Sequence, residues 1–229
     1  MNILKRLTDH IWYMPFESER DRPNLCYIKG DNYSLAIDAG HSEAHAKDFY
    51  ALLEKEGLPL PSLTVITHWH WDHTFGMHAV NGLCIANEKT RDYLAKWKEK
   101  IETNGPDEFL SLHESIRREY AGNKPVIVTL PDIVFSGSME LDLGGIHVKI
   151  MQAESPHTDD STLVYVCEEK VLFIGDSNSG EFPTWIKSRV LSMKLVDTIK
   201  EIDPKICVEG HWEPVETSDT LTDLLTFDN

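Results

Sequence analysis

The chain has 229 residues, and its 22 basic and 38 acidic side chains give a formal net charge of -16. This acidity argues against nucleic acid as a partner, because phosphate contacts need clustered lysine and arginine. No apolar run approaches the roughly 18 residues that a membrane-spanning helix needs, so we expect no membrane span.

The opening of the chain predicts an antiparallel meander, then a helix and a buried strand. Short β-rich stretches at 10–13, 25–29 and 33–38 are separated by turn-forming residues. Residues 42–57 carry apolar side chains near helical spacing and end in glycine, which predicts a helix. The apolar run at 63–67 then predicts a strand.

A dense group of histidines and an aspartate overlaps the end of this strand, where residues 67 to 73 read Thr-His-Trp-His-Trp-Asp-His. Alternate side chains of an extended backbone share a face, so His68, His70 and Asp72 are expected to project together. A turn would bring in His73 from another side. Neutral imidazoles with a few carboxylates suit zinc, and also manganese or iron. The spacing therefore predicts a metal site whose four ligands can serve two ions.

The rest of the sequence predicts a charged helical segment, a second sheet and further helices. Residues 88–124 are charged and helical in pattern, with one break at 104–106, which indicates a helical hairpin. This hairpin either covers one side of the fold as a solvated insertion or forms a lid over a substrate pocket. Further strands are expected at 83–86, 126–129, 133–135, 139–143, 146–152, 162–167, 170–174 and 206–208, and helices at 78–80, 188–202 and 217–226.

The histidine motif resembles the signature of the metallo-β-lactamase-fold superfamily of metal-dependent hydrolases, His-x-His-x-Asp-His at the end of a strand. Three later segments are similar to those that carry the remaining ligands of that family, in the same order: Pro156-His157-Thr158, Gly175-Asp176 and Gly210-His211. The resemblance spans nearly the whole chain. It implies an α+β fold, the four-layer αββα sandwich, formed by residues 1–229 as one domain with the helical segment as an insertion.

The resemblance also implies two divalent metal ions as cofactors, zinc first, with manganese or iron as alternatives. One ion would be held by His68, His70 and His157, and the second by Asp72, His73 and His211. Asp176 would bridge the two. Asp38, in a segment similar to an early Asp-x-Gly of the family, is expected either beside the site or as a cap where a strand ends.

The implied activity is hydrolysis of a small molecule by a hydroxide that bridges the two cations, because a bound metal lowers the pKa of water from 15.7 to about 7. Asp72 would aim this hydroxide and accept its proton. Ester, thioester, lactone, amide and phosphodiester bonds all stay open, and a residual charge of about +1 suits an anionic substrate or a developing oxyanion. One alternative is an iron-dependent oxygenase or redox enzyme on the same scaffold, similar to persulfide dioxygenases. Another is a metal-holding scaffold without turnover.

Other distinctive residues are expected in structural roles. The four cysteines are far apart and form no Cys-x-x-Cys pair, which predicts buried thiols. The N-terminal residues lack the long apolar stretch of a signal peptide, so we expect a cytoplasmic protein. Lone histidines are expected on the surface or in the core, and the tryptophans near ligands are expected to pack: His10, His41, His45, His78, His113 and His147, and Trp69, Trp71, Trp185 and Trp212.

Overall fold

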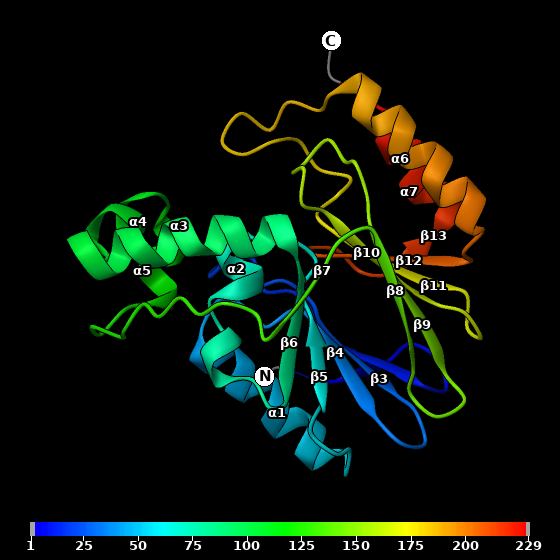
Figure 1. The fold of residues 1–229 in the computed structure, drawn as a ribbon, viewed down its shortest axis with the longest axis horizontal. Helices are drawn as coiled ribbons and strands as arrows, with labels where there is room; N and C mark the ends of the chain where they lie inside the picture. Colours follow the sequence, from blue (N-terminus) through cyan, green and yellow to red (C-terminus); the bar gives the residue numbers. More distant parts are fainter. Residues whose placement is uncertain (1–2, 228–229) are drawn as a thin grey trace.

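Two β-sheets lie face to face in the computed structural model, which describes residues 3–227, and helices cover both outer faces (Figure 1). Within these residues the first sheet has seven strands in chain order: β1 (Lys5–Arg6), β2 (Ile11–Met14), β3 (Leu25–Lys29), β4 (Ser34–Ile37), β5 (Leu63–Val65), β6 (Leu83–Asn87) and β7 (Ile133–Phe135). The second has six, in the order β13-β12-β11-β10-β9-β8: β8 (Ser138–Asp142), β9 (His147–Gln152), β10 (Thr162–Val166), β11 (Val171–Gly175), β12 (Ile206–Glu209) and β13 (Val215–Glu216). This is the predicted αββα sandwich.

The helices divide between the two outer faces (Figure 1). Those beside the first sheet are α1 (Glu43–Lys55), α2 (Trp71–Thr74), the short 3-10 helix η1 (Met77–Ala79), α3 (Glu88–Asn104), α4 (Asp107–Ser111) and α5 (Glu114–Glu119). Those beside the second are α6 (Arg189–Ile202) and α7 (Thr217–Leu224). Helix α1 begins where predicted because the Ser42 side chain accepts a hydrogen bond from the backbone N–H of His45. No helix within residues 3–227 is long and apolar enough to cross a membrane.

Alternating side chains build separate apolar layers. In β3, Ile28 faces the cluster between the two sheets, whereas its neighbour Tyr27 faces outward and packs in a cluster with Phe49 of α1. On the other side of the molecule, Leu195 of α6 packs on the second sheet. Each sheet is therefore buried on both faces, which leaves the ends of the strands as the place for a site.

Parallel strand pairs bring several strand ends to one edge of the sandwich. Strands β4 and β5 are parallel in the first sheet, and β11 and β12 are parallel in the second. At this edge the Thr162 N–H donates a hydrogen bond to the Thr67 carbonyl at 2.7 Å. The segments that follow β4, β5, β11 and β12 therefore meet there.

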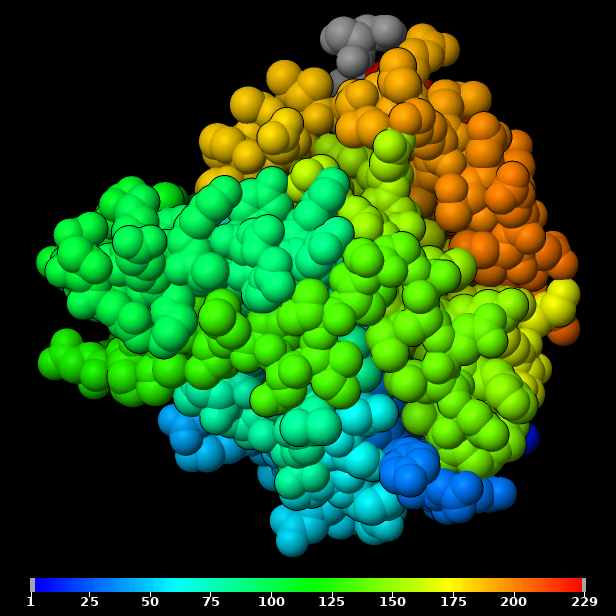
Figure 2. Space-filling view, in the orientation of Figure 1, coloured from blue at the N-terminus to red at the C-terminus, as the bar shows by residue number. Residues whose placement is uncertain are grey.

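The charged segment 88–124 forms three helices between β6 and β7. Helix α3 ends at Gly105, whose φ of 78° is left-handed, so the predicted break is confirmed. The two short helices α4 and α5 replace the single second helix of the predicted hairpin. The segment projects from one side of the molecule (Figure 2), and Phe109 and Ile116 pack in a cluster over the outer face of the first sheet.

The strand predicted at 126–129 is wrong. These residues run between Pro125 and Pro131 without regular pairing. Val128 is buried in the cluster under the helical segment, so the apolar character of this stretch reflects packing rather than a place in a sheet. The other strands predicted for the second half form within one or two residues of their expected bounds.

Candidate metal centre

The seven side chains predicted as ligands come together at the edge where the parallel strands end. They belong to the segment after β5, the loop before β10, and the loops after β11 and β12. Their donor atoms form two groups, and within each group all of these atoms lie within 4.8 Å of one another: His68, His70 and His157 in the first, and Asp72, His73, Asp176 and His211 in the second.

The backbone of the histidine motif differs from the extended strand that we predicted. Strand β5 ends at Val65, and α2 begins at Trp71 after a short loop. The Thr74 hydroxyl donates to the His70 carbonyl at 2.9 Å and holds this helix start. Because the chain turns here, His68 and His70 do not share one face with Asp72. The loop contributes His68 and His70 to the first group, and the helix contributes Asp72 and His73 to the second.

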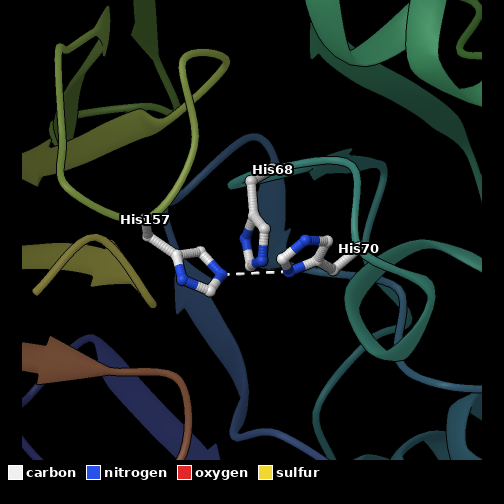
Figure 3. A group of neighbouring side chains, drawn as sticks. All are labelled: His68, His70 and His157. Atoms are coloured by element: carbon white, nitrogen blue, oxygen red, sulfur yellow. Dashed lines mark hydrogen bonds between the residues drawn. The ribbon is translucent and has the colours of Figure 1, made fainter. Parts of the chain in front are cut away.

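Three imidazole rings of the first group point toward one another (Figure 3). The Nδ1 of His70 lies 3.0 Å from the Nε2 of His157. The Nδ1–H of His157 donates to the Gly180 carbonyl at 2.8 Å, so in the neutral ring Nε2 presents a lone pair to His70. The buried Nε2 of His68 has no hydrogen-bond partner among residues 3–227. Converging lone pairs of this kind suit a cation.

Asp38 orients a histidine of the second group. Its carboxylate, at the end of β4, accepts hydrogen bonds from the Nδ1–H of His73 at 2.7 Å, from the Thr67 N–H at 2.8 Å and from the Thr67 hydroxyl at 2.9 Å. The Nε2 of His73 is thereby directed toward Asp72, 3.2 Å from its Oδ2. Of the two predictions for Asp38, the position beside the site is confirmed.

The carboxylate of Asp176 lies between the two groups. Its oxygens are 3.5 Å from the Nε2 of His73 and 3.4 Å from the Nε2 of His211, and one of them is also 3.9 Å from the Nε2 of His157. This is the position that a bridging ligand requires. The Nε2 of His211 also lies 3.0 Å from Asp72 Oδ2, which closes the second group.

The pKa values of the histidines shift in opposite directions in the two groups. Burial and the neighbouring imidazoles lower the pKa of His70 to about 3 and that of His68 well below its usual range, so both rings are neutral at pH 7. In the second group burial opposes ionisation, but the carboxylates Asp72 and Asp176 outweigh it and raise the pKa of His211 to about 10. The pKa of His73 rises for the same reason. A cation entering the second group therefore displaces protons.

The carboxylates of the second group are ionised. Burial would raise the pKa of Asp72, yet the charges of His73 and His211 and the hydrogen bonds from them hold it well below the usual range. The same balance holds the pKa of Asp176 well below its usual range. Both side chains are therefore acceptors at neutral pH, which is the form that a metal ligand needs.

Gly210 packs directly behind the second group. A Cβ at this position would lie 2.0 Å from Asp176 Oδ1 and 3.0 Å from the Cε1 of His73. Only glycine lets the backbone after β12 pass so close to the carboxylate while it delivers His211.

Comparison with known proteins bears directly on this arrangement. The family model described as "Metallo-beta-lactamase superfamily" matches residues 20–211, a span that includes all seven side chains. The chain belongs to the metallo-beta-lactamase superfamily. A relative from Drosophila melanogaster, "Beta-lactamase-like protein 2 homolog", is 23% identical over 198 residues, which are 84% of this chain and 59% of that protein. The chain thus spans less than two thirds of the length of that relative.

Solved structures of the superfamily share the fold. A metallo-beta-lactamase from Pontibacter korlensis has a TM-score of 0.73 at 16% identity, covering 98% of this chain and 97% of that one. One from Hirschia baltica has a TM-score of 0.69 at 16% identity, covering 98% and 96%. The sec-alkyl sulfatase PisA1, as a double mutant, has a TM-score of 0.71 at 14% identity, covering 97% of this chain and 40% of that one. At these identities the likeness shows the fold alone.

A cavity of about 360 Å³ opens onto the second group of this superfamily member. Several of its lining residues are not singled out by the sequence, namely Phe16, Asp21 and Phe182, and His113 was expected only in a structural role. They lie in loops with no periodic pattern, so no spacing could have indicated them. For Phe182 the sequence offers one indication, which is its closeness to a predicted ligand: it follows Asp176 by six residues in the same loop.

Two tryptophans at this cavity contradict the expected packing role. The side chains of Trp185 and Trp212 are 59% and 61% exposed. Trp71 is buried and Trp69 stacks on Trp97, as expected of packing residues. A second cavity of about 680 Å³ reaches His157 and shares His70 and Phe182 with the first. The first group therefore borders both cavities, and the second group borders the smaller one.

Proposed function

We propose that the protein is a metal-dependent hydrolase of small molecules that holds two divalent cations, zinc first and manganese or iron as alternatives. The observation that carries the proposal is the pair of donor groups, His68, His70 and His157 beside Asp72, His73, Asp176 and His211, each compact enough for one ion. Family membership supports the proposal.

The residues fit two cations. The first group offers three converging imidazoles, of which His68 and His70 are neutral, and the second offers two ionised carboxylates with two imidazoles. Two divalent ions held there would supply an activated water at neutral pH and polarise the oxygen of the scissile bond.

Asp72 has a second task in this proposal. Its buried carboxylate is ionised and lies 3.0 Å from His211 Nε2 and 3.2 Å from His73 Nε2. It can therefore accept a hydrogen bond from a water held at this group, orient it and receive its proton. Asp38 and the Gly180 carbonyl support the site indirectly. Their hydrogen bonds hold the rings of His73 and His157 in the orientation that metal binding requires.

The experiment that tests the proposal combines metal analysis with a substrate panel. The purified protein is stripped with a chelator, reloaded with zinc or manganese, and assayed on aryl esters, thioesters, lactones, a β-lactam, phosphodiesters and a sulfate ester. The last substrate is included because of the sulfatase among the structural relatives. We expect about two ions per chain and turnover of at least one bond class that disappears on stripping.

His70→Ala should lose metal and turnover while the sandwich stays folded by circular dichroism. His147→Ala is the matched control, because His147 is exposed and pairs with Glu168 far from the two groups. Normal metal content and activity in His70→Ala would contradict the proposal. So would iron in protein taken from cells together with oxygen uptake on a persulfide, the outcome expected of an oxygenase.

A further inference from the structure

Five aromatic side chains form the aromatic part of the cavity wall beside the second group of donors. This aromatic wall consists of Phe16, Trp71, Phe182, Trp185 and Trp212. The rings contact one another in two groups: the centroids of Phe16 and Trp212 are 6.0 Å apart, and Phe182 lies 5.2 Å from Trp71 and 5.7 Å from Trp185. Aromatic rings packed edge to face in this way form a surface that binds apolar groups.

Trp185 is held at the cavity rim by its loop rather than by the core. Its φ of 57° is left-handed, a conformation that bulky residues rarely adopt, and its N–H donates to the Glu181 carbonyl at 2.7 Å. The loop is so tight that a Cβ on Gly180 would lie 2.0 Å from the Trp185 carbonyl oxygen. The indole stacks on His157, with the rings 20° apart in angle and 6.2 Å between centroids. A strained backbone that exposes a large aromatic ring beside a site points to ligand binding.

The charges around the wall select against anions. The cavity is lined by the carboxylates of Asp21, Asp72 and Asp176, and no lysine or arginine of residues 3–227 lines it. Three carboxylates offset most of the charge of two divalent ions. An anionic group placed against the wall, away from the cations, would therefore find no lysine or arginine and would face Asp21. The imidazoles that line the cavity are His113 and two members of the donor groups, His70 and His211.

We propose that the aromatic wall binds an uncharged aromatic or bulky apolar group of the substrate. The substrate class is then an aryl or large-acyl compound whose scissile bond lies at the two donor groups and whose apolar part lies on Trp185 and Trp212. This inference rests on the proposed hydrolase function for the role of the ligand, but binding to the wall requires no turnover.

The test compares two probes that share a ring system and differ in charge, 2-naphthol and 6-hydroxynaphthalene-2-sulfonate. Their affinities for the zinc-loaded protein are measured by titration calorimetry. We expect 2-naphthol to bind at least tenfold more tightly than the sulfonate. Trp185→Ala and Trp212→Ala should each weaken 2-naphthol binding about tenfold, and Trp185→Phe should retain most of it.

The matched control is Ile186→Ala. Ile186 is the next residue in the loop and is 71% exposed, but it does not line the cavity, so its replacement should change naphthol affinity less than twofold. Equal affinity for both probes, or a loss in Ile186→Ala as large as in Trp185→Ala, would overturn the inference.

Catalysis separates this inference from the proposed function. In acetates whose leaving alcohols have similar reactivity, kcat/KM should be higher for the naphthyl ester 2-naphthylmethyl acetate than for ethyl acetate, and Trp185→Ala should raise KM with less change in kcat. Turnover of ethyl and naphthyl esters at equal kcat/KM, without naphthol binding, would overturn the wall and leave the hydrolase standing. Naphthol binding that depends on Trp185, with no turnover of any bond class, would leave the wall and overturn the hydrolase.

Discussion

Asp72 has two roles in the proposed function, as a metal ligand and as a proton acceptor. Comparing Asp72→Ala with His70→Ala can separate them. Asp72 contributes one donor atom of several in its group, and in the proposed function its ionised carboxylate also accepts the proton of the attacking water. Losing one donor weakens cation binding, whereas losing the acceptor removes general-base catalysis, which is worth roughly 100-fold to 10,000-fold in rate.

We therefore expect Asp72→Ala to lower kcat by at least about 100-fold while most of the metal stays bound at saturating zinc. The two readouts are kcat at saturating substrate and metal content by elemental analysis. His70→Ala serves as the comparison, since it should lose metal and rate together. A variant Asp72→Ala with the full wild-type rate would show that another group handles the proton.

Gly210 allows a prediction about close approach. Gly210→Ala places a methyl group against the Asp176 carboxylate, and the backbone on which that carboxylate lies is fixed by strand pairing. We expect this variant to fold but to bind the second ion at least about tenfold more weakly, equivalent to about 1.4 kcal/mol, measured by competition with a zinc chelator.

Gly57→Ala is the control for this substitution. Gly57 has a φ of 68°, and no atom lies within 4 Å of the position that a Cβ would take, so alanine there strains the backbone without approaching the site. It should cost stability and leave zinc affinity unchanged. Equal zinc affinities in the two variants would mean that Asp176 moves aside without loss.

At the scale of elements, a buried ion pair fastens the helical segment to the sandwich. The guanidinium of Arg22, 1% exposed, donates to both carboxylate oxygens of Glu119 in α5, at 2.8 and 2.7 Å. Ser42, the cap of α1, donates to the same carboxylate, and Arg22 also reaches Asp48 at 2.8 Å. Three elements thus share one charge cluster directly after Asp21, which lines the cavity.

Removing the carboxylate should be costly because it leaves a buried, partly unpaired guanidinium. We expect Glu119→Gln to lower the free energy of unfolding by about 3 kcal/mol, measured by denaturant titration at pH 7. Glu102→Gln removes an exposed pair with Lys98 one helix away and should cost less than about 0.5 kcal/mol. Equal losses in the two variants would show that the Arg22 cluster adds nothing to stability.

The same pair predicts a pH dependence. Burial would raise the pKa of Glu119, but the hydrogen bonds from Arg22 and Ser42 outweigh it and lower the pKa below its ordinary value of 4.5. A lowered folded-state pKa means that the stabilisation is complete above pH 4.5 and is lost as the pH falls through the folded value. The stability gap between wild type and Glu119→Gln should therefore be constant from pH 7 to pH 5 and shrink below pH 4. A gap that widens in acid would contradict this assignment.

Sequence patterns located most elements because their causes are local. The strand before the histidine motif, the cap at Ser42 and the stop at Gly105 all act within a few residues of chain. The failed strand at 126–129 has the apolar residues of a strand, but the helical segment above it uses them for packing. No local pattern distinguishes these two fates.

The candidate site divides in the same way. The motif residues follow a predicted strand, and His157, Asp176 and His211 are indicated by the resemblance of their segments to the later ligand segments of the family. The aromatic wall and the pairing of Arg22 with Glu119, 97 residues apart, depend on how loops cross after the sheets have packed. Neither the aromatic wall nor this ion pair has a residue spacing from which the sequence could predict the contact.

For the whole molecule, the two donor groups join the two sheets. His68, His70, Asp72 and His73 follow the first sheet, whereas His157, Asp176 and His211 belong to the second. A cation bound to both halves favours the folded state over the unfolded chain. At a free concentration 100 times its Kd it adds about 2.7 kcal/mol to the free energy of unfolding.

Chelation should therefore lower the Tm by several degrees, at about 2 to 4 °C per kcal/mol for a chain of this size. Zinc should restore the Tm of the wild type and of His147→Ala, but only weakly that of His70→Ala. The measurement is differential scanning calorimetry at fixed protein concentration. A Tm that ignores chelator and zinc alike would mean that no ion joins the sheets.

The hydrogen bond from His157 to the Gly180 carbonyl has a consequence for how the proposed hydrolase can change over evolution. One short loop both exposes Trp185 at the cavity and accepts the hydrogen bond that orients His157 of the first donor group. Mutations that reshape the loop to bind a new compound will also change the orientation of His157 and thereby the affinity for the ion. Selectivity and cation retention are thus inherited together, and variants selected for altered preference should differ in their need for added zinc.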